Sequence, residues 1–375
     1  MKFLRPFAAL LFSALVGLTA QAASPIKIGE YGSLTGKEAS FGQSSHKGIV
    51  LAFEELNAAG GALGSPLQLV TEDNQTKPGE SATVAKKLIT RDKVVALLGE
   101  VASGRSLEAA PVAQKARVPM VAPAATNPKV TQTGNYVFRV CFIDPFQGTV
   151  MAKFAKEDLK ATRVAVLSSV SNAYSVGLAK FFRETFTAGG GEIVAEKNFS
   201  EGDKDFRAQL TAVKASGAEA VFVPSYYTEA ALIVRQAREL GINVPFFGGD
   251  GWEAPQLLQI GGDALEGCYY STHFSPENQD PTVQQFVAKF KERWNGETPD
   301  AFAALGYDAA YVLVDAIKRA GSTEGPKLRA ALAETKDFAG VTGVTTIDKN
   351  RDASKPAAIL AIKGGKLTFL KTVAP

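Results

Sequence analysis

The sequence has only two cysteines and two histidines among its 375 residues. Two cysteines cannot build a disulfide-dense scaffold, and so few Cys and His residues give little support to a metal site. Both cysteines, Cys141 and Cys268, lie inside apolar, strand-like runs (FRVCFI and GCYYST), which favours free buried thiols over a disulfide. We therefore expect neither a disulfide framework nor a metal centre.

Motifs of the common enzyme classes are missing as well. The sequence contains no G-x-S-x-G, H-E-x-x-H, G-x-x-x-x-G-K-[ST] or G-x-G-x-x-G motif. His46, which we expect to be an exposed helix residue, and His273 stand in unrelated contexts, so no Ser-His-Asp triad is indicated. The sequence thus predicts no catalytic residue and no cofactor.

Long apolar runs are absent after the N-terminus. There, Lys2 and Arg5 precede an apolar run over residues 7–18, and Ala20-Gln21-Ala22 follows. This order predicts a secretory signal peptide, residues 1–22, and therefore a secreted product. The alternative is a membrane anchor, but the run is shorter than the roughly 20 residues that span a bilayer.

An excess of charge of one sign is also absent. Without residues 1–22, which contain Lys2 and Arg5 and no acid, the 41 basic residues become 39 against 38 acidic ones. A nearly neutral chain gives no reason to expect nucleic acid or an anionic membrane as a partner. Its hydrophobic content of 46% with 21% charged residues is typical of a globular protein with an ample core.

What the sequence does contain is a repeated alternation of strand-like and helix-like segments. The first set has strands near 26–31, 67–71, 94–98 and 118–122, a helix over 43–59 that Ser44 and Ser45 cap, and a helix that Pro78 opens and that runs to residue 91. After an apolar run at 136–143, Asp144-Pro145 breaks the pattern, and a second set begins at 164. Two such sets predict two parallel-sheet α/β domains.

The last hundred residues are helix-rich and end in a hairpin over 359–370. The first domain has fewer helices than its strands need. We therefore expect the helices after residue 280 to return to the first domain and the hairpin to join the second. Both domains are then discontinuous, which predicts a hinge between them.

The stretch Val94–Pro128 joins a strand, a turn, a helix, a second strand and a second turn, as in a βαβ unit. Ser103 and Thr126 lie in the two turns, at carboxyl ends of strands, where open α/β sheets bind ligands. Ser103 is also near a helix start, whose free N–H groups attract anions. These residues predict a cradle for a small carboxylate, with ordinary capped turns as the alternative.

Two turns of the second set carry complementary groups. Tyr226 follows the strand that ends at Val223, and Asp250 follows the strand that ends at Phe247. A carboxylate and a phenol can hold an ammonium, so the four turns together suit an amino acid zwitterion. The alternatives are a turn role for Asp250 between glycines and rim packing for Tyr226.

Several long segments in the same order resemble the periplasmic Leu/Ile/Val-binding protein family, the substrate-binding components of branched-chain amino acid ABC transporters. The most specific segments are GKEASFG, GIVLAFEELNAAGG, GEVASGRS, VPMVAPAATNPKVT, YYTEAALIVRQAREL and GGDGW. The resemblance covers essentially the whole mature chain. It implies an α/β type I periplasmic-binding-protein fold of two lobes, three hinge crossings, and no enzymatic activity.

The resemblance also implies domain boundaries and a binding site. The signal peptide would cover residues 1–22, lobe I residues 24–143 plus 274–349, and lobe II residues 144–273 plus 350–375. The family's site positions fall on ten residues. Those for the ligand carboxylate are Ser103, Ala124 and Thr126, those for the ammonium are Tyr226 and Asp250, and those for the ligand side chain are Phe41, Val101, Ala102, Tyr174 and Phe302.

Three departures from the family pattern affect the expected ligand. The disulfide of the family's prototypes falls on Asn74 and Ala102 and is therefore absent, and Asp250 replaces a longer Glu. Glu100 and Arg105 add charges that we expect at the pocket edge, where they could admit a polar ligand side chain.

The resemblance implies a periplasmic, monomeric protein that delivers an amino acid to the permease of an ABC transporter. Two other classes remain as alternatives: a ligand sensor that signals to a membrane receptor, and a secreted hydrolase. The identity of the ligand stays open at this point.

Overall fold

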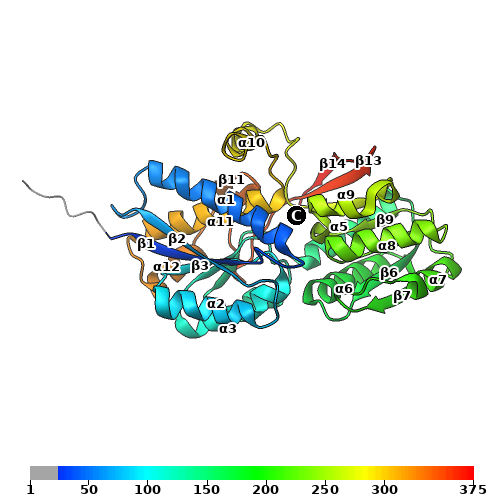
Figure 1. The fold of residues 1–375 in the computed structure, drawn as a ribbon, viewed down its shortest axis with the longest axis horizontal. Coiled ribbons are helices and arrows are strands. Elements are labelled where there is room, and N and C mark those ends of the chain that lie inside the picture. The colour runs from blue at the N-terminus through cyan, green and yellow to red at the C-terminus, as the bar shows by residue number, and fades with distance from the viewer. Residues whose placement is uncertain (1–23) are drawn as a thin grey trace, which may run out of the picture.

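A computed structural model describes residues 24–375 of the chain. The expected signal peptide lies outside the described residues. Two α/β lobes lie side by side. Figure 1 shows the early part of the chain with the late orange helices in the left lobe, and the green middle of the chain with the red C-terminal hairpin in the right lobe. Within residues 24–375, no helix combines the length and the apolar character that a membrane span requires.

Lobe I is built on a parallel five-stranded sheet with the strand order β2-β1-β3-β4-β5. The strands are β1 (Ile26–Gly32), β2 (Leu67–Asp73), β3 (Ala96–Leu98), β4 (Met120–Ala122) and β5 (Val137–Arg139). The central strands β3 and β4 are fully buried, as expected for short apolar runs in a parallel sheet.

Helices cover both faces of this sheet, with α1 and α11 on one face and α2 and α3 on the other (Figure 1). The helical elements of this lobe are α1 (Ala39–Ala58), α2 (Glu80–Lys87), the π-helical turn η1 (Leu88–Asp92), α3 (Ser103–Ala116), α4 (Lys129–Gln132), α10 (Pro281–Arg293), α11 (Ala301–Ala320) and α12 (Gly325–Ala333). Helices α1 and α11 approach closely because Gly48 has no side chain: a Cβ there would lie 1.8 Å from the Ala303 carbonyl oxygen. The expected return of the late helices to the first lobe is therefore seen.

Lobe II is built on a seven-stranded sheet with the order β14-β13-β10-β9-β8-β6-β7. The strands are β6 (Arg163–Ser169), β7 (Glu192–Phe199), β8 (Ala220–Phe222), β9 (Phe246–Gly248), β10 (Tyr269–Thr272), β13 (Ala357–Lys363) and β14 (Lys366–Val373). Strands β6 to β10 pair in parallel, whereas the C-terminal hairpin β13–β14 adds to β10 antiparallel. The hairpin thus joins the second lobe, as expected from the sequence.

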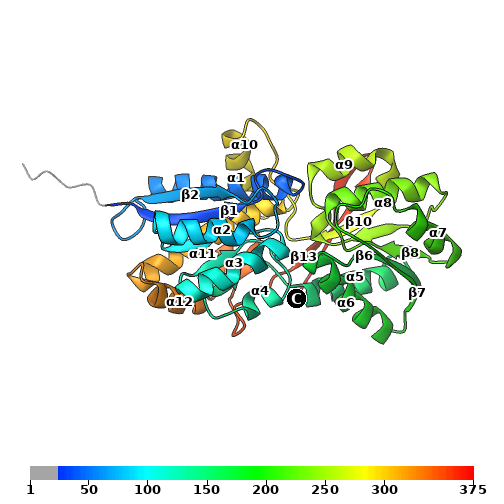
Figure 2. The same ribbon diagram turned by 60° about the horizontal axis from the view of Figure 1, so that its bottom comes forward.

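The helices of lobe II also form two layers (Figure 2). Helices α5 and α6 pack together on one face, and α8 packs against α7 and α9 on the other. The bounds are α5 (Asp144–Glu157), α6 (Ala173–Ala188), α7 (Arg207–Ala215), α8 (Tyr227–Glu239), α9 (Pro255–Gly261) and the 3-10 turns η2 (Asp250–Trp252) and η3 (Gly262–Leu265). The chain passes between the two sheets after β5, after β10 and before β13.

Three local predictions were wrong, and one element was missed. Helix α1 begins at Ala39 with no side-chain cap, and Ser44, which lies inside the helix, bonds Asp300, the residue that precedes α11. Pro78 does not open α2, since Gly79 adopts a left-handed conformation and the helix starts at Glu80. Asp144-Pro145 does not end a pattern but starts helix α5, with Pro in its first turn. A short hairpin, β11 (Phe338–Gly340) and β12 (Gly343–Thr345), was not predicted.

Candidate functional site

A small cavity lies between the lobes, where the strands of both sheets end. Its empty volume is about 190 Å³. It is lined by Phe41, Val101, Ser103, Ala124, Thr126, Tyr174, Tyr226, Asp250, Gly251 and Phe302. We call it the cleft cavity. Nine of the ten predicted binding residues line it, and the exception is Ala102, whose backbone N–H donates to Glu100.

On the lobe I side, the cavity meets the start of helix α3. Ser103 is the first residue of this helix and does not cap it; its Oγ accepts a hydrogen bond from the Asn127 N–H at 3.2 Å. The first N–H groups of a helix have no acceptor within the helix. The Thr126 side chain is 1% exposed, and its hydroxyl lies at the cavity wall next to the Asp144 carboxyl. This side of the cavity therefore offers donors to an anion.

On the lobe II side, the cavity meets a carboxylate held by two side chains. Asp250 is 3% exposed, its Oδ1 accepts from Gln147 Nε2 at 2.9 Å, and its Oδ2 lies 2.9 Å from His273 Nε2. Gln147 comes from helix α5, and His273 directly follows β10. Sequence reasoning missed both residues, because it treated 144–145 as a break and His273 as unrelated to the site.

The environment of His273 keeps this imidazole neutral. Burial lowers its pKa, and the ring stacks on Phe142 with centroids 3.7 Å apart. A neutral ring that bonds a carboxylate through Nε2 carries its proton on that nitrogen, and Nδ1 has no partner among the described residues. Asp250 therefore receives two neutral donors and no full positive charge, so its negative charge stays available to a cation.

Aromatic side chains form the rest of the wall. Tyr174 stacks on Tyr226 with ring centroids 5.3 Å apart, and the Tyr174 hydroxyl accepts from the Gly251 N–H at 3.1 Å. Burial, reinforced by the nearby Asp250, raises the pKa of Tyr174 well above its usual value, so its phenol stays protonated. Phe41 makes edge contacts with Tyr226 and Phe302 at 5.1 and 5.0 Å. This aromatic part of the cavity wall is therefore apolar apart from its phenol groups.

The two lobes touch around the cavity. The Tyr227 hydroxyl donates to the Lys37 carbonyl oxygen at 2.6 Å, and Asn127 Nδ2 donates to the Ala173 carbonyl oxygen at 2.7 Å. An ion pair between Lys37 and Glu201, 2.9 Å long, joins the same lobes. This is a closed arrangement, in which a ligand in the cavity would contact both lobes.

A further carboxyl group lies beside the cavity. Asp144, the first residue of α5, is fully buried next to the Thr126 hydroxyl. Burial raises the pKa of Asp144 to about 8, and the nearby Asp250 adds to the rise. Near neutral pH the Asp144 carboxyl is therefore mostly protonated, which leaves Asp250 as the negative group of this region.

The prediction that Glu100 and Arg105 lie at the cavity edge was wrong. Glu100 is buried and accepts hydrogen bonds from the Ser33 N–H, the Ala102 N–H and Asn74 Nδ2 at 2.7, 2.8 and 3.1 Å. Its carboxyl thus connects Asn74 and Ala102, the two positions at which the resemblance placed the missing disulfide. Arg105 pairs with Glu38 at 3.3 Å instead. Both charged groups, which had suggested a polar ligand side chain, are therefore bonded to other protein groups and do not face the cavity.

The remaining chemistry-bearing residues lie outside the cavity wall. Cys141 and Cys268 are free and buried, as predicted, and burial raises the pKa of each to about 12. His46 is half-buried against Glu30 at 2.7 Å, so the expectation of an exposed residue was wrong. Across residues 24–375, no group of three or more His, Cys, Asp or Glu side chains is arranged to hold a metal ion.

Comparison with known proteins shows which family the chain resembles over nearly its whole length. The family described as "Periplasmic binding protein" matches residues 25–366. A leucine-, isoleucine-, valine-, threonine- and alanine-binding protein of Pseudomonas aeruginosa is 31% identical over 349 residues, which cover 93% of this chain and 92% of that protein.

Solved structures of similar proteins also match nearly the whole length of this chain. The leucine-binding protein LivK of Thermotoga maritima has a TM-score of 0.90 and 43% identity, covering 93% of this chain and 99% of that one. The branched-chain amino acid transporter substrate-binding protein LivJ of Streptococcus pneumoniae, in complex with isoleucine, has a TM-score of 0.89 and 36% identity, covering 94% and 100%.

Proposed function

This chain belongs to the periplasmic binding protein family, and we propose that it captures an amino acid between its lobes and delivers it to an ABC transporter. The observation that carries the proposal is the polarity of the cleft cavity. One side presents hydroxyl and N–H donors, and the other presents a carboxylate supported by two neutral donors. An α-amino acid carries one negative and one positive group on adjacent atoms, which matches this arrangement.

In this proposal the ligand carboxylate binds to Ser103, Thr126 and the backbone at Ala124 and at the start of α3. The ligand ammonium binds to Asp250, with Tyr226 beside it. Both contacts exist together only when the lobes meet, so the ligand stabilises the closed form. Binding is the whole activity, and no chemical step is required.

The proposed ligand has a branched aliphatic side chain. Phe41, Val101 and Phe302 give the cavity an apolar wall, which suits an aliphatic side chain. Glu100 and Arg105 are paired elsewhere, so no charged side chain beside Asp250 lines the space. The names of the relatives support leucine, isoleucine and valine as the first candidates.

The proposed setting follows from the same family and from the N-terminus. Residues 1–22 would direct the chain to the periplasm and be removed. The closed, ligand-bound monomer would then dock on the permease subunits of the inner membrane, which release the ligand to the transport path.

A thermal-shift screen of the mature protein tests this function directly. We expect leucine, isoleucine or valine to raise the melting temperature, because a ligand at 100 times its Kd stabilises the native state by about 2.7 kcal/mol. The decarboxylated amine and the deaminated acid of the best ligand serve as controls and should give smaller shifts. A screen in which no amino acid shifts the melting temperature, while simple carboxylates do, would refute the proposal.

A further inference from the structure

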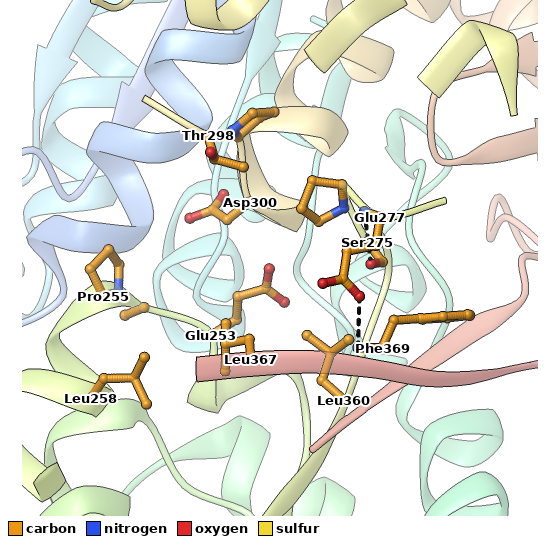
Figure 3. Close-up of a pocket in the computed structure, with 13 residues that line it drawn as sticks. Glu253, Pro255, Leu258, Ser275, Glu277, Thr298, Asp300, Leu360, Leu367 and Phe369 are labelled. Atoms are coloured by element: carbon orange, nitrogen blue, oxygen red, sulfur yellow. Dashed lines mark hydrogen bonds between the residues drawn. The ribbon is translucent and has the colours of Figure 1, made fainter. Parts of the chain in front are cut away.

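A second and larger pocket lies at the junction of the lobes, apart from the cleft cavity. Figure 3 shows it between helix α9, the strands β13 and β14, and the segment before α11. Its empty volume is about 790 Å³. We call it the junction pocket, and its lining residues are Glu253, Ala254, Pro255, Leu258, Ser275, Pro276, Glu277, Thr298, Pro299, Asp300, Leu360, Leu367 and Phe369. No residue lines both spaces.

The walls of the junction pocket are mostly apolar. Leu258 of α9 lies on one side, and Leu360, Leu367 and Phe369 of the C-terminal hairpin lie along the base in Figure 3. Leu367 is 38% exposed, although it is a large apolar side chain. Apolar surface that stays accessible inside a concave space gains free energy when an apolar ligand covers it.

Each charged residue that lines the junction pocket is an acid. The carboxyl groups of Glu253 and Glu277 point into the pocket (Figure 3), and Asp300 lines its upper part. Across residues 24–375, none of these three acids forms an ion pair with Lys, Arg or His. Their partners are neutral groups: Glu253 Oε1 accepts from the Ala301 N–H at 2.8 Å, and Glu277 Oε2 from the Phe369 N–H at 3.1 Å.

Burial disfavours the negative charge of the two acids that lie deepest in the protein. Burial raises the pKa of Glu253 to about 8, and the neighbouring Asp300 adds to the rise. Burial likewise raises the pKa of Asp300. A positive group in the pocket would favour the ionised form of both, because an opposite charge offsets the cost of a buried carboxylate.

We propose that the junction pocket binds a small organic cation with an apolar body, such as an alkyl- or arylalkyl-ammonium. The ammonium lies among Glu253, Glu277 and Asp300, and the apolar body covers Leu258, Leu367 and Phe369. An organic anion is disfavoured by the three carboxyl groups. A bare metal ion would leave the apolar walls uncovered. This site is independent of the proposed amino acid site.

Calorimetric titration of the mature protein with benzylammonium, and separately with benzyl alcohol as the uncharged analogue, tests the site. We expect benzylammonium to bind at least about tenfold more tightly than benzyl alcohol. Leu367→Arg, which places a positive charge in the pocket, should weaken benzylammonium binding about tenfold or more. Glu277→Gln should weaken it several-fold.

Two control variants distinguish the junction pocket from the neighbouring surface and from the cleft cavity. Leu370, on the same strand and also 38% exposed, does not line the pocket, so Leu370→Arg should bind benzylammonium as the unaltered protein does. Asp250→Ala should retain benzylammonium binding as well, because Asp250 lines the other cavity and reaches the pocket only through its neighbour Glu253. The proposal is overturned if no heat appears at about 10 mM ligand. It is equally overturned by equal affinity for amine and alcohol, by equal loss in the two arginine variants, or by loss in Asp250→Ala.

Discussion

The lobe I side of the cleft cavity takes its polar groups from turns that directly follow β3 and β4, whereas the lobe II side depends on distant partners. Ser103 and Thr126 lie within a few residues of their strands. Asp250 also follows its strand, but its supporting side chains, Gln147 and His273, are 103 and 23 positions away in the sequence.

The two sides of the cavity therefore use two kinds of binding group: donors near a helix start in lobe I, and a buried carboxylate in lobe II. Hydroxyl and N–H donors at a helix start need little support, because the helix geometry already orients them. A buried carboxylate does need support, since an unpartnered charge in a dry site is costly. Removing the lobe II carboxylate itself should therefore cost more binding free energy than removing a hydroxyl from the lobe I side.

The largest expected effect comes from removing the carboxylate. Asp250→Ala should weaken leucine binding about 1000-fold, because a buried ammonium without its partner costs several kcal/mol. Isothermal calorimetry measures the change. Asp263→Ala, at an exposed acid of the same lobe, is the matched control and should retain full affinity.

A smaller loss is expected on the lobe I side. Thr126→Val removes the hydroxyl at nearly constant shape and should weaken leucine binding by about 10- to 100-fold, as expected for one hydrogen bond to a charged group. Thr133→Val, at a half-buried position of the same lobe away from the cavity, is the control. If Thr126→Val lowered affinity more than Asp250→Ala did, the comparison between the two sides would be wrong.

The supporting residues of Asp250 should give a smaller effect still. His273→Leu leaves Asp250 Oδ2 without a donor and should weaken leucine binding about tenfold. His273→Gln keeps an N–H donor and should recover most of that loss. Calorimetry gives the affinities, and circular dichroism confirms that both variants fold. Equal affinities in the two variants would show that His273 only fills space.

The smallest effect on affinity is expected at Asp144, which lies beside the cavity but not in its wall. Asp144→Asn should change leucine affinity less than about threefold. Its effect should instead appear in the free energy of unfolding. The folded-state pKa of about 8 lies above the value near 4 of an unfolded Asp, so the protein loses stability as pH rises from about 4 to 8.

Denaturant unfolding at pH 5 and pH 8 measures this difference. Asparagine does not ionise, so we expect Asp144→Asn to lose less stability between the two pH values, by more than about 1 kcal/mol. An unchanged pH dependence would mean that Asp144 ionises normally in the folded protein.

Much of the fold could be predicted from the sequence, because its strands and helices follow strong local patterns. The helix over 103–116 and the return of the C-terminal hairpin to lobe II are examples. What escaped prediction depends on tertiary contacts. Helix α5 was missed because Asp144-Pro145 was interpreted as a break, although Pro is favoured in a first helical turn.

The candidate site shows the same limit. The lining residues could be named from their positions after strands and from the family resemblance. The support of Asp250 could not, since Gln147 lies on the unpredicted helix and His273 follows a neighbouring strand. Glu100 and Arg105 were placed wrongly because their partners, Asn74 and Glu38, are distant in the sequence.

The most direct test of the zwitterion clamp combines two ligands with two proteins. Leucine and 4-methylpentanoate, which lacks only the amino group, are titrated by calorimetry into the unaltered protein and into Asp250→Ala. We expect the unaltered protein to bind leucine about 1000-fold more tightly than 4-methylpentanoate, and the variant to bind the two within about threefold. If Asp250→Ala kept the full preference for leucine, Asp250 would not hold the ammonium, and the proposed binding mode would be wrong.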